Sequence, residues 1–201
     1  MTGDLRTLAA CEQLFNRVNE RFRRCDVLVN NAGATRAGAF LDLPDAVWLE
    51  GFALKFFGAV RLTRLFWPLL KASQGSVINI VGGAARTPDP EFLIGGAVNA
   101  AVANFSKGLS KLGNRDNVNV NVIHPGNTDT ERQDELRRQR AAALGRTVDE
   151  LRAEALSKSN VRRFGKPEDI AALVLFLCSE RARHVQGTAI AVDGGATSGL
   201  Y

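Results

Sequence analysis

The sequence predicts an α/β fold in which a parallel sheet is covered by helices on both faces, a doubly wound arrangement. Four short β-prone runs are predicted to form strands: residues 26–30 and 75–81 have the composition of buried strands, 117–123 alternates between polar and apolar residues, and 187–195 forms the last strand and its turn. Longer segments with helical periodicity separate these runs. Strands that alternate with helices form parallel sheets, so the order of the elements carries the prediction.

The first predicted helix spans residues 5–24, because Leu8, Cys11 and Phe15 recur on one face with charges opposite. It leads into an apolar run that ends in Asn30-Asn31-Ala32-Gly33. We expect a strand buried on both faces, followed by a turn without bulky side chains. Turns at the carboxyl ends of parallel strands are where open α/β sheets bind ligands, so this turn is the first candidate site.

The later elements follow in the same alternating order. Long helices are predicted over 44–71, with Pro68 bending or ending the first of them, and over 92–112. Residues 127–163 are charged and helix-prone with few large apolar residues, which predicts a lid-like excursion over the sheet. A further helix is expected to start at Pro167. We expect residues 1–201 to form one domain.

From Asp4 to Gly195, these elements resemble in order those of the short-chain dehydrogenase/reductase family. The Asn-Asn-Ala-Gly turn and the final stretch 187–195 carry the resemblance most clearly. It implies a Rossmann-like fold, NAD(P) as the cofactor and interconversion of carbonyls and alcohols. The cofactor-binding residues that it implies are Asp4 beside the adenine ring, Asn31, Ala32 and Gly33 at the adenosine ribose, and Pro125, Gly126, Thr128 and Thr130 on the nicotinamide side. The alternative to cofactor binding by Asn31, Ala32 and Gly33 is that these residues form a tight turn, which requires small side chains.

The family's first two βα units, with their glycine-rich phosphate-binding turn, have no counterpart before Asp26. The strand at 27–29 would then be an exposed apolar edge. Three explanations are open: a truncated gene product, an edge covered by another copy or by a displaced N-terminal segment, or another segment of the chain that replaces the missing strands. In each case the usual pyrophosphate cradle is absent, so tight cofactor binding is not expected.

The resemblance also assigns the family's catalytic Ser, Tyr, Lys and Asn to four positions, and all four are changed. Flanking residues place Gly82 at the Ser, Gly95 at the Tyr, Asn99 at the Lys and Lys55 at the Asn. Glycine has no proton to donate, so the usual acid–base step cannot run through Gly95. The only tyrosine is Tyr201, at the C-terminus. Lys55 and Asn99 remain as candidate catalytic residues: Lys55 as a proton donor or a structural or surface lysine, Asn99 as a ligand contact or a helix-packing or local backbone contact.

Two functions therefore stay open: an NAD(P)-linked oxidoreductase with weakened or non-standard chemistry, and a non-catalytic subunit or binding module of the same fold. We expect a homo-oligomer formed through the long helices 44–71 and 92–112. The net charge of +5 resides in residues 132–166, with ten Lys or Arg against five Asp or Glu. This window is either a solvated face or an attractor for a small anionic substrate.

Composition argues against other classes of protein. The basic window has no aromatic interleaving, so no nucleic-acid partner is expected. Cys11, Cys25 and Cys178 form no C-x-x-C pair, which favours reduced thiols in the cytoplasm over a disulfide framework or a metal site. His124 and His184 lie far apart without a ligand cluster, so no metal is expected. No apolar run reaches the ~18 residues of a membrane span.

Overall fold

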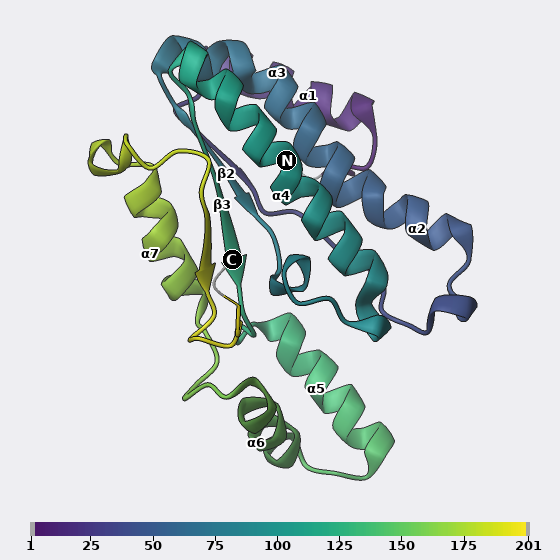
Figure 1. The fold of residues 1–201 in the computed structure, drawn as a ribbon. Coiled ribbons are helices and arrows are strands. Elements are labelled where there is room, and N and C mark those ends of the chain that lie inside the picture. Colours follow the sequence, from purple (N-terminus) through teal and green to yellow (C-terminus); the bar gives the residue numbers. More distant parts are fainter. Residues whose placement is uncertain (1–2, 200–201) are drawn as a thin grey trace.

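Four parallel strands form the sheet at the centre of the chain (Figure 1). The computed structural model describes residues 3–199. The strands β1 (Val27–Asn30), β2 (Ser76–Ile80), β3 (Asn119–Pro125) and β4 (Ala189–Val192) pair in the order β1-β2-β3-β4. Val29 lies opposite Ile78, and Asn30 lies opposite Asn79. The predicted α/β fold and the pairing of residues 26–30 with 75–81 are confirmed.

Helices cover the two faces of the sheet unequally (Figure 1). The helices α1 (Leu8–Phe22), α3 (Gly58–Ser73) and α4 (Leu93–Asp116) lie on one face, and α7 (Pro167–Leu177) lies on the other. Successive side chains of β2 point to opposite faces of the sheet. Val77 packs with Phe66 of α3, whereas Ile78 packs with Leu177 of α7. Burial of these apolar side chains on both sides of one sheet supplies the main stabilisation.

The helices α5 (Glu131–Leu144) and α6 (Val148–Ser159) lie beyond the carboxyl ends of the strands (Figure 1). The start of α6 is fixed by a capping box, in which Thr147 Oγ1 accepts from the Glu150 N–H and the Glu150 carboxylate accepts from the Thr147 N–H. Helix α7 begins at Pro167, as predicted. Shorter 3₁₀ turns lie at Phe40–Asp42, Gly83–Ala85, Pro90–Phe92 and Glu180–Ala182.

The predicted helix 44–71 is divided in a way that the sequence did not indicate. It consists of α2 (Asp45–Phe52), one π-helical turn (Ala53–Phe57) and α3. Pro68 does not end the helix, which continues to Ser73. Pro68 and Arg64 are both exposed, so water can satisfy the carbonyl that loses its N–H partner. The π turn carries Lys55, and π-helical insertions are frequent at functional sites.

The expectation that β1 is buried on both faces was wrong. Leu28 packs among the side chains beneath α1 and α3, but Val27 and Val29 on the other face are each 41% exposed. The physical reason is that α7 covers β2 and β3 and leaves β1 bare. Within residues 3–199 no backbone hydrogen bond reaches the outer edge of β1, and no further strand joins the sheet. A replacement strand or a displaced covering segment from this part of the chain is therefore contradicted.

Two further observations concern membrane-spanning helices and metal-binding clusters. None of the helices among the described residues is long and apolar enough to cross a membrane. In that same part of the chain, no three His, Cys, Asp or Glu side chains gather closely enough to hold a metal ion. Tyr201 lies outside the described residues.

Candidate functional site

Polar side chains hold the carboxyl end of β1 in place. Asn30 Nδ2 donates to Asn79 Oδ1 at 2.7 Å and to Thr63 Oγ1 at 3.1 Å. Asn79 Nδ2 in turn donates to Ser106 Oγ at 2.7 Å. This buried network ties β1, β2, α3 and α4 together, so the turn at residues 31–33 starts from a fixed point. Sequence reasoning identified the turn but missed the network beneath it.

A groove of about 590 Å³ runs between this turn and α7. Four predicted cofactor-binding residues line it: Asn31, Pro125, Thr128 and Thr130. Its other wall is apolar and includes Ile170 and Val174 of α7. The structure thus brings together residues from the ends of β1 and β3, as expected where parallel strands end at one edge.

The two threonines that line this groove also make hydrogen bonds to the backbone of the chain. Thr128 Oγ1 donates to the Gly126 carbonyl at 3.0 Å, and Thr130 Oγ1 caps α5 by accepting from the Gln133 N–H at 3.3 Å. Gly126 itself does not line the groove, and a Cβ on it would lie 2.7 Å from Asp193 Cβ. Gly126 is therefore required for close packing of this loop against the chain after β4.

Asp4 and Ala32 line a second, more open cavity of about 650 Å³ together with Leu5, Arg6 and Leu54. Arg6 Nε donates to Asp4 Oδ1 at 2.9 Å, and hydrogen bonds from Arg6 lower the pKa of Asp4. Arg6 also pairs with Glu50 of α2. Asp4 is thus an ion-paired carboxylate at the cavity wall, beside the turn where the sequence placed an adenosine group.

Lys55 lies across the turn at Gly33. A Cβ on Gly33 would approach Lys55 Cδ to 2.8 Å, so the lysine stem occupies the space above the glycine. The side chain is half-buried, and burial lowers the pKa of Lys55 to about 8. Lys55 is thus not fully exposed, and the structure leaves open whether it is a proton donor or a structural lysine. Because Gly33 has no side chain, the Lys55 stem can lie directly above it.

Asn99 fills the space beside Gly82. A Cβ on Gly82 would lie 2.7 Å from Asn99 Nδ2, so the Asn99 amide stands where a serine side chain at position 82 would begin. Asn99 is 3% exposed, and its Oδ1 is buried without a hydrogen-bond partner. Buried polar atoms are nearly always paired, so an unpaired acceptor at this position points to a donor that the chain itself does not supply.

Phe92 fills the space beside Gly95 in the same way. A Cβ on Gly95 would lie 2.0 Å from Phe92 Cε1 and 2.1 Å from Cζ. The phenyl ring therefore occupies the volume that a tyrosine side chain at position 95 would enter. Sequence reasoning missed Phe92; its position three residues before Gly95 at the start of α4 was the available signal.

His124 of β3 completes the centre. Its side chain is 2% exposed, and its Nδ1 lies 3.1 Å from the Gly82 carbonyl oxygen. Burial is the main cause that lowers the pKa of His124, and the charges of Arg86 and Lys55 lower it further. A neutral imidazole that donates through Nδ1 to Gly82 accounts for this geometry. Sequence reasoning had treated this histidine only as a non-ligand.

The charged segment 127–163 is organised around the Phe164 ring. The guanidinium carbons of Arg137 and Arg152 lie 4.6 and 4.9 Å from the ring centroid. Asp129 pairs with both arginines, at 3.0 Å to Arg137 and 2.5 Å to Arg152. Hydrogen bonds led by Arg152 lower the pKa of Asp129. Much of the basic window is therefore engaged in internal ion pairs.

Comparison with known proteins was made for the sequence and for the fold. The profile of the enoyl-(acyl carrier protein) reductase family matches residues 1–197. The chain is 30% identical to the uncharacterized oxidoreductase YvaG of Bacillus subtilis, over 98% of this chain and 75% of the relative. It is 29% identical to the 3-oxoacyl-[acyl-carrier-protein] reductase FabG of Thermotoga maritima, over 92% of this chain and 71% of that enzyme.

Among solved structures, the chain is similar to L-sorbose reductase from Gluconobacter frateurii, determined in complex with NADPH and L-sorbose. The TM-score is 0.93 at 31% identity, and the match covers 98% of this chain and 76% of the reductase. YwfH, an NADPH-dependent reductase involved in bacilysin biosynthesis, matches with a TM-score of 0.90 at 26% identity, over 100% of this chain and 78% of that one.

Proposed function

The chain belongs to the short-chain dehydrogenase/reductase family, and from this premise we propose that it is an NAD(P)-linked oxidoreductase that interconverts a carbonyl and an alcohol. The groove at the carboxyl edge of the sheet carries the proposal, because it gathers Asn31, Pro125, Thr128 and Thr130 against α7. The relatives support the same activity, since L-sorbose reductase is described with NADPH and its substrate.

The residues present fit one part of the cofactor better than another. The groove beside α7 and the cavity beside Asp4 flank the turn that carries Asn31 and Ala32, which suits a long ligand with a ribose at the turn. No glycine-rich turn that would hold a pyrophosphate lies among residues 3–26. We therefore propose that this part of the chain holds the nicotinamide half of the cofactor in the groove and a ribose at the turn. When bound, NAD(P) would supply or accept the hydride.

Lys55 and Asn99 are the proposed catalytic residues. With a pKa of about 8, Lys55 carries a proton near neutral pH and can exchange it with a substrate oxygen. The buried Asn99 Oδ1 has no hydrogen-bond partner, which supports its proposed role as an acceptor for a hydroxyl. The family's catalytic Ser, Tyr, Lys and Asn correspond to positions 82, 95, 99 and 55, which here hold Gly, Gly, Asn and Lys. In this proposal Lys55 and Asn99 act in place of that set. Weakened turnover is expected, because Lys55 has to serve in place of a set of cooperating groups.

A second candidate function is a non-catalytic subunit or binding module. The observation that favours it is the filling of the centre by Phe92 and Asn99, which leaves little room for a substrate oxygen beside Gly82 and Gly95. Under this alternative, as under the first, the chain would associate with a copy of itself through the long helices α3 and α4. Residues 127–163 would act as a lid over the groove in the first function only.

Calorimetric titration of NADH and NADPH into the purified chain tests the proposed function. Micromolar binding, followed by cofactor-dependent turnover of small carbonyl compounds, would support it. Ala32→Trp is expected to block binding because Ala32 lines the cavity beside Asp4, whereas Ala37→Trp, at an exposed position farther along the same loop, leaves binding unchanged. An absence of binding at millimolar cofactor would overturn the oxidoreductase proposal and favour the binding module.

A further inference from the structure

A cavity of about 270 Å³ lies between the facing sides of α5 and α6. From α5 it is lined by Gln133, Arg137 and Arg140, which have the spacing of one helix face. The lining from α6 has the same spacing and consists of Leu151, Glu154, Ala155 and Lys158. None of the described residues lines both this cavity and the groove beside α7, so the proposed hydride transfer leaves the cavity unused.

Positive charge dominates the polar lining of this cavity. Arg137, Arg140 and Lys158 supply three cations, against the single carboxylate of Glu154 among the described lining residues. Lys158 pairs with Glu154 at 2.7 Å. Arg140 is exposed, and it makes no ion pair and no hydrogen bond with any residue that the structure describes. An unpaired guanidinium in the wall of a cavity with excess positive charge attracts an anion.

Arg137 is held in position before any ligand arrives. Its guanidinium carbon lies 4.6 Å from the centroid of the Phe164 ring. It pairs with Asp129 at 3.0 Å and with Asp134 at 2.8 Å, and neither carboxylate lines the cavity. Both bonds come from Nη1, so the donors on Nη2 and Nε remain for another partner. An arginine that is already fixed lowers the entropic cost of binding a ligand.

The other walls of the cavity suit the organic part of a ligand. Leu151 is 9% exposed and Phe164 is 2% exposed, so buried apolar surface lies beside the cations. The side-chain amides of Asn127 and Gln133 add neutral N–H donors. Cations, neutral donors and apolar surface together favour a ligand that carries an anionic group on an organic portion.

We propose that this cavity binds a small phosphate monoester, whose phosphate oxygens accept hydrogen bonds from Arg137, Arg140 and Lys158. The described lining has two positive charges in excess, and a phosphate monoester carries a charge of about −1.5 to −2 near pH 7. A carboxylate would leave one of these charges unmatched. Guanidinium groups also bind phosphate through two N–H donors at once.

This site goes beyond the proposed function, because binding there needs neither a nicotinamide cofactor nor a hydride transfer. It also bears on the basic window at residues 132–166, which the sequence left as a solvated face or an attractor for an anion. Three of its cations line one cavity, which favours the second role for them. Asn127 lines the cavity and Thr128 lines the groove, so the two sites meet at the loop after β3.

Calorimetric titration of phenyl phosphate into the unaltered chain, at fixed ionic strength and without any nicotinamide, tests the proposal. We expect saturable binding of one molecule per chain. Inorganic phosphate lacks the organic portion and should bind more weakly, and phenol lacks the phosphate and should not bind. Equal affinity for phenyl phosphate and inorganic phosphate would overturn the assignment to a monoester. An absence of saturable binding at millimolar phenyl phosphate would overturn the site itself.

Two substitutions in the lining should change the affinity in opposite directions. Arg140→Gln removes the unpaired cation and should weaken phenyl phosphate binding by at least about fivefold. Glu154→Gln removes the carboxylate and releases Lys158, so it should strengthen binding by roughly twofold to fivefold. Arg140 is exposed, so its replacement leaves the fold intact and decides the matter even if Glu154→Gln does not fold.

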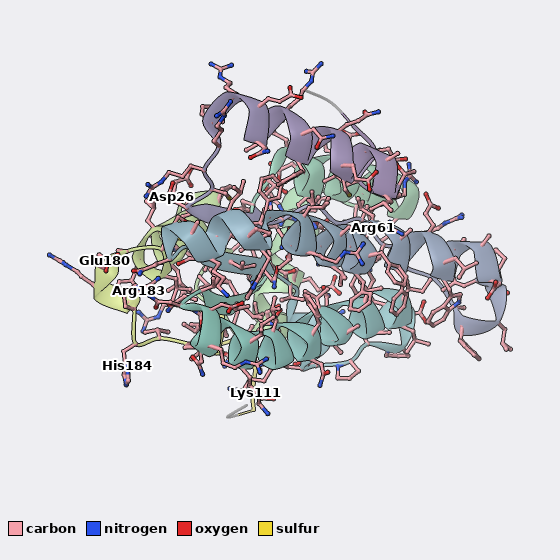
Figure 2. All side chains as sticks on the ribbon, turned by 90° about the horizontal axis from the view of Figure 1, so that it is seen from above. Asp26, Arg61, Lys111, Glu180, Arg183 and His184 are labelled. Atoms are coloured by element: carbon pink, nitrogen blue, oxygen red, sulfur yellow. The ribbon has the colours of Figure 1, made fainter. Side chains whose placement is uncertain are left out.

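Two control variants remove the same charge outside the cavity. Arg138→Gln changes an exposed residue of α5 that pairs with Glu135, and Lys111→Gln changes an exposed residue on the outer surface of α4 (Figure 2). Both should keep the affinity within about twofold at fixed ionic strength. Equal weakening by Arg140→Gln and by the controls would reduce the binding to general charge attraction and overturn the proposal. Failure of NAD(P) binding would leave this result untouched.

Discussion

At the scale of single residues, other side chains fill the space beside two glycines of the centre. The Asn99 side chain lies beside Gly82, and the Phe92 ring lies beside Gly95. Close packing explains this, because a void of that size in a folded domain would lower its stability. The centre is thus closely packed, and a tyrosine cannot be introduced at position 95 without moving the Phe92 ring.

The packing of Phe92 on Gly95 predicts opposite effects for two glycines of the same helix. Gly95→Ala should lower the free energy of unfolding by about 1–2 kcal/mol, because its Cβ overlaps the ring. Gly108→Ala should raise it by roughly 0.5–1 kcal/mol, since no atom lies within 4 Å of its Cβ. Urea unfolding measures both. Adding Phe92→Ala should relieve the Gly95→Ala strain, and a doubly destabilised variant would refute this reason.

The buried amine of Lys55 predicts a pH-dependent stability. Its pKa is about 8 in the folded chain and 10.5 when unperturbed, so between these values the unfolded chain binds more protons. Stability should therefore rise with pH across this window, by up to about 3 kcal/mol from this group. Below pH 8 the cost of burying the charge is fully present.

The comparison that isolates this effect is urea unfolding of the unaltered chain and of Lys55→Met between neutral pH and pH about 10. Lys55→Met should be the more stable protein at neutral pH, and its advantage should shrink as the pH rises. Exposed Lys111→Met should show no such trend. A constant difference across the range would mean that the Lys55 pKa is not lowered in the folded protein.

At the scale of elements, Asp129 joins α5 and α6 to the loop after β3. It holds Arg137 and Arg152 on either side of the Phe164 ring. Asp129→Asn removes the charge that both guanidinium groups share, so we expect hydrogen exchange to quicken by roughly tenfold in α5 and α6 while the sheet keeps its protection. Glu135→Gln is the control, because Glu135 pairs only with exposed neighbours within α5. Equal effects of the two changes would remove Asp129 from this role.

At the scale of the whole molecule, the sheet has a bare edge. Val27 and Val29 are exposed on the face of the sheet that carries α7, at the part that α7 does not reach, and Leu175 of α7 is 73% exposed in the wall of the groove that Val29 also lines. Apolar edge strands of this kind associate with other strands unless a charge blocks them. The expectation that another chain covers the edge therefore stays a prediction.

Analytical ultracentrifugation of Val29→Lys tests whether the edge is an interface. A lysine on an edge strand opposes strand pairing, so we expect Val29→Lys to remove association beyond any dimer that forms through α3 and α4. Leu144→Lys, at an exposed apolar position on α5, should leave the association unchanged. If the unaltered chain is monomeric at all concentrations, the bare edge is tolerated in isolation and the prediction fails.

The local sequence was sufficient for the elements and their order. The apolar runs at 27–29 and 76–80, the helical periodicity between them and Pro167 at a helix start depend on residues close in the chain, and the structure has each of these elements. The same holds for the turn at Asn31, which follows directly from the strand before it. Periodicity and turn chemistry act over a few residues, so the sequence alone determines them.

Only the tertiary structure decided what happens where distant segments meet. That Val29 is exposed depends on which strand α7 covers, and that Asn99 stands beside Gly82 depends on how α4 packs against the loop after β2. The half-buried state of Lys55 depends on the π turn and on Gly33, 22 positions earlier in the sequence. Burial, and with it the pKa of Lys55, is a property of all the atoms packed around a group, and no local pattern in the sequence specifies them.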